Sequence, residues 1–244
     1  MIRVASYNVH KCCGLDRRTR PQRIAEVLAQ LDADVIALQE VLAIENGSPE
    51  ENQAQFIADL LGGYSVHFGE NRRLRGGAYG NATLTRIPYK PGCNYDLTWK
   101  QRERRGCLRT DLEHSRGLLH LFNIHLGTSF VERRHQARHL VSEGVLGAPE
   151  LQGHVVVVGD FNEWTRGLAS RLMSERYARV DLHHPPLLRR SYPGVLPILH
   201  LDHLYFDRRL HLERFSVHRS RQALIASDHL PLVAEFNLPE PTSS

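Results

Sequence analysis

Short apolar runs alternate with amphipathic stretches along almost the whole chain. The runs Ile2 to Val9, Val35 to Val41 and His154 to Val158 have the length and β-branched content of buried strands. Between the first two, Arg20 to Leu31 carries apolar residues at helical spacing. Asn52 to Leu61 predicts a second helix, which two adjacent glycines end.

The pattern changes from Tyr64 to His125, where short apolar segments follow one another with turn residues between them. This spacing predicts a mostly antiparallel region, with strands at Ala82 to Ile87, Cys107 to Leu112 and Leu118 to Ile124. The other expected elements are helices at Val131 to Val145 and Leu168 to Tyr177, and strands at Leu201 to Phe206, Leu212 to Val217 and Pro231 to Phe236. Alternation and meanders in both halves fit two packed sheets with helices outside.

The composition predicts one domain. The chain has 244 residues, 41% of them hydrophobic, and no linker or repeat interrupts it. We expect a single domain over residues 1–238 and a disordered tail over 239–244. The first residues lead straight into a strand without a signal-peptide pattern, no apolar run could span a bilayer, and the four cysteines form no C-x-x-C pair. These features predict a cytoplasmic monomer with free thiols.

Polar clusters stand at or near the ends of the predicted strands. There are seven of them: Tyr7-Asn8-Val9-His10, Leu38-Gln39-Glu40-Val41, Gly80-Asn81-Ala82, Asn123-Ile124-His125-Leu126, Gly159-Asp160-Phe161-Asn162, Leu201-Asp202-His203 and Ser227-Asp228-His229. A single such cluster carries little information, but the set in this order is specific. With it, the chain resembles the endonuclease/exonuclease/phosphatase superfamily, which includes deoxyribonuclease I and neutral sphingomyelinases. The resemblance implies a four-layer α/β/β/α sandwich of two mostly antiparallel sheets, with the site at one edge.

Hydrolysis of a phosphate ester requires neutralisation of charge on the phosphate oxygens, for which hard oxygen ligands around Mg²⁺ are suited. Glu40, at the end of an apolar strand, is the leading metal ligand, and Asn8 supplies a neutral oxygen beside it. By resemblance, Asp228 joins this metal site, directly or through water. We therefore expect Mg²⁺ as the cofactor, with Mn²⁺ able to replace it, and leave open whether one or two ions bind.

The expected catalytic groups are His125, Asp160, Asn162, Asp202 and His229. Asp160 and Asn162 have the i, i+2 spacing that points two strand side chains the same way. The resemblance implies that Asp160 orients or deprotonates the attacking water and that Asn162 holds the water or a phosphate oxygen. It also pairs Asp202 with His229 and makes His125 a donor to the phosphoryl or leaving oxygen. Whether Asp160 or His229 is the general base stays open.

Further residues are expected at the substrate phosphate: Asn81 by resemblance, and His10, Lys11 and Arg105 from their positions near the clusters. The net charge is only +4, but of 31 basic residues all except Lys11, Lys90 and Lys100 are arginine. Arginine clusters at 72–75 and 102–109 are compatible with a polyanion groove or with ordinary solvated faces.

The substrate is the least determined feature. Glu40 is followed by Val41-Leu42, and Asp202 by His203, which departs from the apurinic-site endonucleases. The leading hypothesis is metal-dependent cleavage of phosphodiesters in DNA or other nucleic acid, most simply by an endonuclease. A phospholipid or small-molecule phosphoesterase is the alternative, and an inactive binding module keeping the fold is the third.

Overall fold

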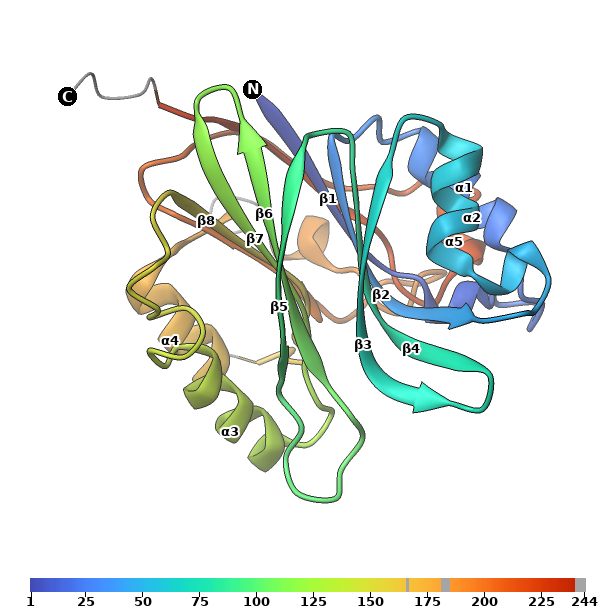
Figure 1. The fold of residues 1–244 in the computed structure, drawn as a ribbon, viewed down its shortest axis with the longest axis horizontal. Coiled ribbons are helices and arrows are strands. Elements are labelled where there is room, and N and C mark those ends of the chain that lie inside the picture. The colour runs from blue at the N-terminus through green and yellow to red at the C-terminus, as the bar shows by residue number, and fades with distance from the viewer. Residues whose placement is uncertain (166, 181–184, 240–244) are drawn as a thin grey trace.

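The computed structural model describes residues 1–165, 167–180 and 185–239, and within them the chain forms two six-stranded sheets packed face to face (Figure 1). The first sheet has the order β11-β12-β1-β2-β4-β3. Its strands are β1 (Ile2–Asn8), β2 (Val35–Ile44), β3 (Ser65–Leu74), β4 (Gly77–Thr85), β11 (His211–Val217) and β12 (Leu232–Asn237).

The second sheet has the order β5-β6-β7-β8-β10-β9. Its strands are β5 (Tyr89–Asp96), β6 (Gly106–His114), β7 (Gly117–His125), β8 (His154–Asp160), β9 (Ala178–Arg179) and β10 (Asp202–Phe206). Only one pair of neighbours in each sheet is parallel, β1 with β2 and β7 with β8. The expected mostly antiparallel character is therefore confirmed.

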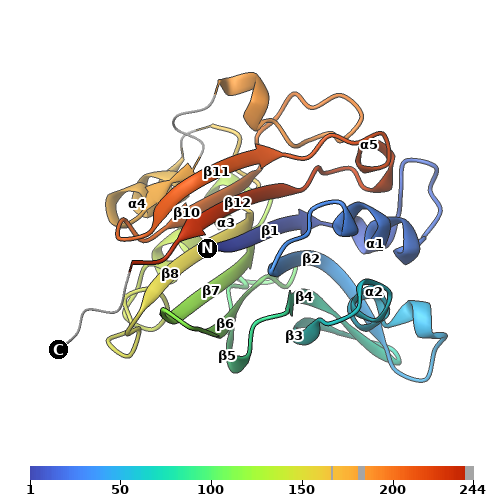
Figure 2. The same ribbon diagram turned by 90° about the horizontal axis from the view of Figure 1, so that it is seen from above.

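Helices cover the outer faces of both sheets, so the expected four-layer sandwich is confirmed. The helices α1 (Pro21–Ala29), α2 (Gln53–Leu61) and α5 (Ala223–Ala226) lie beside the first sheet, and α3 (Phe130–Leu140) and α4 (Leu168–Arg176) beside the second (Figures 1 and 2). Short 3₁₀ helices at His10–Cys12, Pro49–Glu51 and Pro186–Arg189 lie in the connections.

The four valines of β8 are buried on both faces of the strand. Val156 and Val158 point into the core between the sheets, while Val155 and Val157 pack under α3 and α4. Because successive side chains of a strand face opposite ways, a central strand covered on both faces needs apolar residues at every position. Asp160 is the last residue of this central strand and therefore lies at the sheet edge where the site forms.

Three elements differ from the sequence-based expectation. The strand predicted at Ala82 to Ile87 begins five residues earlier, at Gly77, and ends at Thr85. The strand predicted to end at Val41 continues to Ile44, through a bulge in its pairing with β4 between Leu38 and Val41. The helix predicted to reach Val145 ends at Leu140, where the hydroxyl of Ser142 bonds the carbonyl of His139 and tight turns follow. Side chain to backbone bonds of this kind compete with helix continuation.

The region from residue 64 to 125 contains two strands that the apolar pattern did not single out, β3 and β5. Both lie at sheet edges, where one strand side is unpaired and polar residues and Pro91 are tolerated. Of the expected disordered tail, residues 240–244 fall outside the described residues. No described helix combines the length and apolarity needed to cross a membrane.

Candidate active site

The polar clusters predicted from the sequence meet at one edge of the sandwich. Asn8, His125 and Asp160 are the last residues of β1, β7 and β8, and Asp202 is the first residue of β10. Asp202 lies directly opposite Asp160 because β10 runs antiparallel to β8. Ser227-Asp228-His229 lie just before β12, which pairs with β1, so the C-terminal cluster reaches the same edge.

Glu40 faces this edge because of the bulge in β2. Gln39 and Glu40 together stand opposite Asn81 of β4, and the backbone of Glu40 has a φ of +59°. A bulge re-aims side chains, and a non-glycine residue in the left-handed region persists only where its surroundings hold it. The sequence therefore predicted Glu40 as a site residue, while the bulge that turns it toward this edge is a tertiary feature.

Asp202 and His229 form a buried pair. His229 Nδ1 lies 2.8 Å from Asp202 Oδ2, which also accepts a hydrogen bond from the Ser191 hydroxyl. The other imidazole nitrogen, Nε2, lies 3.7 Å from Asp160 Oδ2. Burial opposes a charge on His229, but the carboxylates of Asp202 and Asp160 outweigh burial and raise the pKa of the imidazole. The pairing implied by the resemblance is thus present as a contact.

Asp160 is held from two sides. Its Oδ2 accepts a hydrogen bond of 3.0 Å from the Asn8 amide, and its Oδ1 accepts one of 2.8 Å from the backbone N–H of Asn162. Burial, with the nearby carboxylate of Asp202, raises the pKa of Asp160 above its ordinary value, although His229 works against the shift. A carboxyl group with a raised pKa is a stronger base when ionised than an ordinary aspartate.

Asn162 reaches the site by a different route from the one expected. The strand ends at Asp160, and Asn162 has a φ of +49°, so strand alternation does not extend to it. The bond from its N–H to Asp160 Oδ1 is an Asx turn, and its side-chain amide donates to the Leu126 carbonyl at 2.9 Å. The second hydrogen bond fixes Asn162 to the segment that follows His125.

His125 is oriented by Arg105. A guanidinium nitrogen of Arg105 lies 3.1 Å from His125 Nδ1, and since arginine only donates, Nδ1 accepts and the proton lies on Nε2. Burial, followed by the positive charge of Arg105, lowers the pKa of His125 well below its ordinary value. The neutral ring directs Nε2–H toward Asp160 Oδ2 at 3.6 Å and Glu40 Oε1 at 3.9 Å. Arg105 is buried and acts through His125 in this arrangement.

A more exposed rim completes the cluster. Lys11 Nζ lies 3.4 Å from Glu40 Oε2, and His10 Nδ1 lies 3.7 Å from Asp228 Oδ1. His10, Lys11 and Cys12 all have positive φ, a left-handed turn that is costly for L-residues. Gln53 stabilises it by donating a 2.7 Å hydrogen bond to the Lys11 carbonyl.

Asn81 lies below the other predicted residues and is fully buried. Its amide nitrogen donates to the carbonyls of Asn123 and Gly106 at 3.1 and 3.3 Å, which joins the two sheets. Gln39 and Asn123 extend this bridge with a 2.8 Å side-chain bond. The predicted contact of Asn81 with substrate phosphate stays a prediction.

Sequence reasoning gave no role to four polar residues that support the site: Gln39, Asn123, Ser191 and Ser227. Ser191 bonds Asp202, and the Ser227 hydroxyl donates to the Asn8 carbonyl at 2.8 Å, which ties the C-terminal cluster to β1. Gln39, Asn123 and Ser227 lie inside the quoted clusters, so their positions were the available signal. Ser191 lies in a loop, and nothing in the local sequence marks it.

Two sets of residues could hold a divalent cation. Ligand atoms of Asp160, Asp202 and His229 lie within 4.8 Å of one another. His229 Nδ1 and Asp202 Oδ2, however, already bond each other, which leaves the pair only Asp202 Oδ1 and His229 Nε2 for an ion. The second set, Glu40 and Asp228, is more open to solvent and faces Lys11 and His10 of the rim, whose place beside the carboxylates a bound metal ion would take.

The donor chemistry of this second set fits a hard cation, because it consists of carboxylates that are partly open to solvent. Burial opposes ionisation of Glu40, but His125, Lys11 and the Asn8 amide outweigh it and lower the pKa of the carboxyl to about 2. Asn8 turns its NH₂ group toward Glu40 at 3.3 Å and toward Asp160. Its Oδ1 accepts the His10 N–H at 3.0 Å, so Asn8 here positions the two carboxylates.

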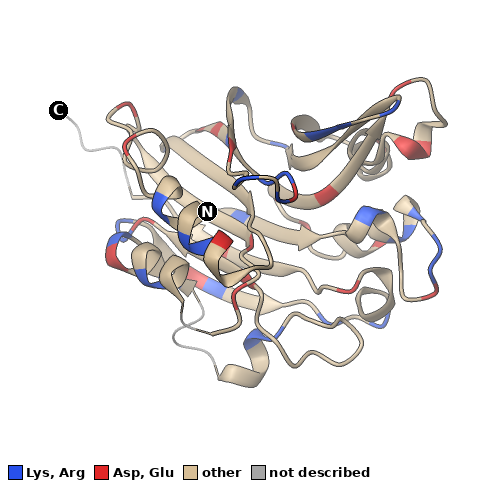
Figure 3. Ribbon diagram, turned by 90° about the horizontal axis from the view of Figure 1, so that it is seen from below, with Lys and Arg blue, Asp and Glu red and all other residues tan. Residues whose placement is uncertain are grey.

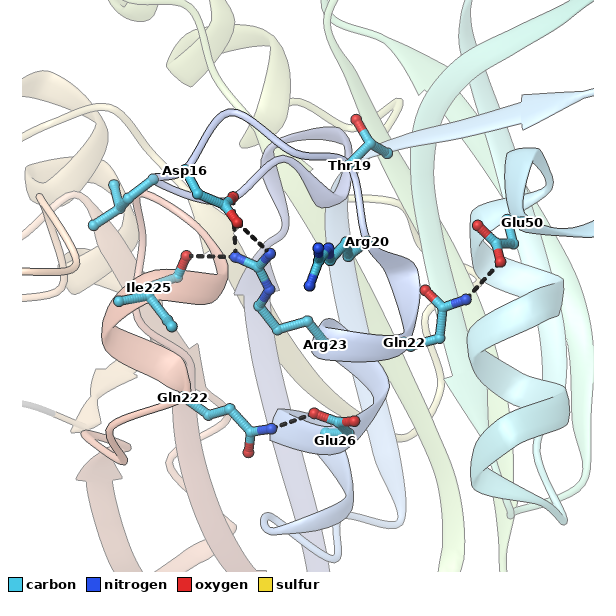
Figure 4. Close-up of a pocket in the computed structure, with 10 residues that line it drawn as sticks. Asp16, Thr19, Arg20, Gln22, Arg23, Glu26, Glu50, Gln222 and Ile225 are labelled. Carbon is cyan, nitrogen blue, oxygen red and sulfur yellow. Dashed lines mark hydrogen bonds and ion pairs between the residues drawn. The ribbon is translucent and has the colours of Figure 1, made fainter.

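A hollow of about 800 Å³ lies apart from this cluster (Figure 4). It lies between α1 and α5 and is crossed by the ion pair of Arg23 with Asp16, at 2.8 Å. Arg23 also donates to the Ile225 carbonyl in α5 at 3.3 Å. Because α5 is followed at once by Ser227, this contact braces the segment that carries Asp228 and His229.

Comparison with known proteins agrees with the geometry. The chain is 28% identical to the uncharacterized protein YbhP of Escherichia coli over 253 aligned positions, which cover 97% of this chain and 96% of that protein. D. rerio TDP2, solved with a single-strand DNA product, superposes with a TM-score of 0.76 at 17% identity, covering 97% of this chain and 98% of that one. The mannosyl-6-phosphatase Bt3783 of Bacteroides thetaiotaomicron gives 0.75 at 18% identity, covering 98% and 100%.

At these identities the solved structures establish the fold alone. The family is established by the sequence itself, since residues 5–229 match the Endonuclease/Exonuclease/phosphatase family, whose members are hydrolases of phosphoesters. That match begins before Asn8 and ends at His229, and so spans every residue of the cluster described above. The chain belongs to the Endonuclease/Exonuclease/phosphatase family.

Proposed function

We propose that the protein is a divalent-metal-dependent phosphodiesterase that cleaves nucleic acid. The observation that carries this proposal is the arrangement around Asp160. Its Oδ2 lies 3.7 Å from His229 Nε2 and 3.6 Å from His125 Nε2, so three groups able to accept or donate protons surround one point. An in-line displacement at phosphorus needs such groups around the phosphate.

Asp160 is the proposed base. Because the carboxylates around His229 favour its protonated form, His229 is suited to stabilise negative charge rather than to accept a proton. The raised pKa of Asp160, caused first by burial, suits it to take a proton from the attacking water. Asp202 then fixes the orientation of His229, and Asn8 and the N–H of Asn162 fix that of Asp160.

His125 is proposed to donate its Nε2–H to an oxygen of the phosphate, since Arg105 occupies Nδ1. Lys11, with its side chain about half exposed, is proposed to contact a non-bridging oxygen. Glu40 and Asp228 would hold the cation, which would supply neutralisation of charge on the phosphate oxygens. Its identity is proposed to be Mg²⁺, with Mn²⁺ as a substitute.

The test is a metal-dependence assay on plasmid DNA, single-stranded DNA, RNA and bis-p-nitrophenyl phosphate, with p-nitrophenyl phosphate as the monoester. We expect diester cleavage that requires Mg²⁺ or Mn²⁺ and stops with chelator. Turnover that continues in excess EDTA contradicts metal dependence. Cleavage of the monoester or of phospholipid, without any cleavage of nucleic acid, would favour a small-molecule or lipid phosphoesterase, a class to which the Bacteroides fold neighbour belongs by name.

A further inference from the structure

A cationic surface lies beside the site, on two elements distant in sequence. The β5–β6 loop, residues 97–105, exposes Lys100, Arg102 and Arg104, and the solvent face of α3 exposes Arg134 and Arg138. Figure 3 shows the blue segments of this loop and of α3 next to each other on the face seen from below. We call these five side chains the loop–helix patch.

Direct contacts make the loop and the helix one surface. The Trp99 ring stacks on the His135 ring of α3 with 4.7 Å between centroids. The amide of Gln136, also in α3, donates to the Leu97 carbonyl at 3.1 Å. The buried face of the helix is therefore fixed to the loop, and its exposed face continues the surface that the loop presents.

The loop–helix patch is continuous with the catalytic cluster. Its loop ends at Arg105, which contacts His125, and α3 begins five residues after His125 along the chain. Arg133 closes that short connection by donating to the carbonyls of Gly127 and Thr128 at 3.2 and 2.6 Å. A polymer bound with one phosphate at the cluster would therefore meet the patch with its neighbouring phosphates.

Few acids offset the charge of the patch. Asp96 pairs with Arg104 at 3.4 Å, and Glu103 pairs with the buried Arg105 at 2.9 Å. Among the described residues, no acidic side chain forms an ion pair with Lys100, Arg102 or Arg138. Glu132 is the acid of α3 and is buried, so the solvent face of the helix carries only cationic or potentially cationic charge.

We propose that the loop–helix patch binds the phosphate backbone of a nucleic acid whose scissile phosphate occupies the cluster around Asp160. This inference rests on the proposed function and deepens it by assigning the surface that selects a polymer over a small diester. Four of the five cations are arginines, whose planar fork fits phosphate oxygens. A neutral contact surface would not favour a polyanion in this way.

A membrane surface fits the patch less well. Trp99 does not protrude, because His135 covers one face of its ring and the Lys100 ammonium lies 4.7 Å from the ring centroid. The exposed apolar side chains nearby are Phe130 and Val131 at the start of α3 and Trp164, and the guanidinium groups of Arg134 and Arg133 lie over the Phe130 and Trp164 rings. Binding to lipid requires apolar side chains that insert between headgroups, together with cations.

The test compares two triple variants that lose the same charge. The patch variant is Arg102→Ala/Arg134→Ala/Arg138→Ala. The control is Lys90→Ala/Arg208→Ala/Arg214→Ala, whose exposed side chains lie near the start of β5, just after β10 and in the middle of β11, away from the cluster. Affinity for labelled single-stranded and duplex DNA is measured by anisotropy against salt concentration in EDTA. Hydrolysis of bis-p-nitrophenyl phosphate is measured separately with Mg²⁺.

We expect the patch variant to bind DNA more weakly at every salt concentration. If each arginine neutralises one phosphate, the slope of log affinity against log salt becomes shallower by about 0.9 per arginine on duplex and about 0.7 on single strands. Its hydrolysis of bis-p-nitrophenyl phosphate stays at the wild-type rate. The control keeps the wild-type slope.

Unchanged DNA affinity and slope in the patch variant would overturn the inference, and so would an equal loss in the control. Loss of binding to phosphatidylserine vesicles with DNA binding retained would replace nucleic acid by a lipid surface. Binding is measured without metal and without turnover. The proposed function fails separately, if the wild-type protein cleaves no phosphodiester in the presence of metal.

Discussion

Two carboxylate–histidine pairs in this fold have the same contact and different surroundings. In the site, His229 Nδ1 lies 2.8 Å from Asp202, and in the second sheet, away from the site, His120 Nδ1 lies 2.6 Å from Asp111. Both imidazoles are buried. A close Asp–His contact alone therefore does not identify a catalytic group.

The difference lies in the remaining atoms of each pair. Asp111 also accepts two hydrogen bonds from Arg109, at 2.7 and 2.9 Å, and His120 Nε2 contacts the Gln152 carbonyl at 3.2 Å. His229 Nε2 instead faces a third titratable group, Asp160, and Asp202 Oδ1 has no hydrogen-bond partner among the described residues. A structural pair uses up its hydrogen-bonding capacity, whereas the pair at the site keeps one nitrogen for chemistry.

Replacing Asp160, which faces His229 and has no counterpart beside His120, has the largest expected effect on activity. Asp160→Asn keeps an oxygen that can accept the Asn8 hydrogen bond but removes the proposed base, so we expect kcat on bis-p-nitrophenyl phosphate to fall about 10⁴-fold. The matched control, Asp111→Asn, alters the structural pair and is expected to lower thermal stability while kcat changes little. An Asp160→Asn enzyme with near wild-type kcat would rule out Asp160 as the base.

The next test asks whether Asp202 works by orienting His229 or whether the two side chains act independently. Asp202→Asn and His229→Ala should each lower kcat, with His229→Ala losing about 10²- to 10⁴-fold, while the fold and the bound metal are retained. Because the two side chains act as one unit, the double variant should fall far short of the product of the single losses. Fully multiplicative losses, measured in steady-state kinetics, would mean that the contact at 2.8 Å is not functional.

The pH profile sharpens the comparison further. Burial raises the pKa of Asp160 above the ordinary 3.8, so activity that needs its carboxylate is lost as pH falls through the raised value. Although burial opposes it, Asp202 raises the pKa of His229 above the ordinary 6.5, so activity that needs the imidazolium is lost as pH rises through that raised value. We expect Asp202→Asn to move the alkaline limb of kcat to lower pH, and an unmoved limb would contradict the assignment.

The same shifts make folding stability fall with rising pH, but in different pH ranges, because in both cases the folded state holds its proton more tightly than the unfolded chain does. The raised pKa of His229 gives a contribution that is fully present below pH 6.5 and lost as pH rises through the folded-state value. The raised pKa of Asp160 means that the folded state loses stability as pH rises from about 3.8 through its folded-state value. Denaturant titrations of wild type and Asp160→Asn across pH separate the two, because the variant lacks the second effect and keeps a smaller first effect, since the Asp160 carboxylate contributes to the raised pKa of His229.

The smallest expected effect concerns the exposed rim. Lys11 is about half exposed beside Glu40, and ion pairs of this kind contribute roughly 1 kcal/mol or less, so Lys11→Met should raise KM by no more than about fivefold. Lys90→Met, remote from the site, is the control. A loss of kcat as large as that of His229→Ala would place Lys11 among the catalytic residues.

Much of the fold followed from local pattern. The valines of β8 had to form a strand covered on both faces, and a polar residue directly after such a run, like Asp160, had to lie at a sheet edge. The order of the polar clusters then indicated the family. The two edge strands β3 and β5 were not evident, because an edge strand tolerates polar residues and lacks a clear apolar period.

The sequence by itself therefore determined the alternation of strands and helices and, with the family resemblance, indicated the layered architecture and most of the residues that meet at its edge. The tertiary structure alone decided how they meet. The bulge that turns Glu40 toward the site depends on pairing with β4, and the tautomer of His125 depends on Arg105, twenty residues away. Likewise, the contacts of the two second imidazole nitrogens, His229 Nε2 with Asp160 and His120 Nε2 with Gln152, join distant segments, because local sequence specifies side-chain type while long-range packing specifies which hydrogen-bonding atoms remain open.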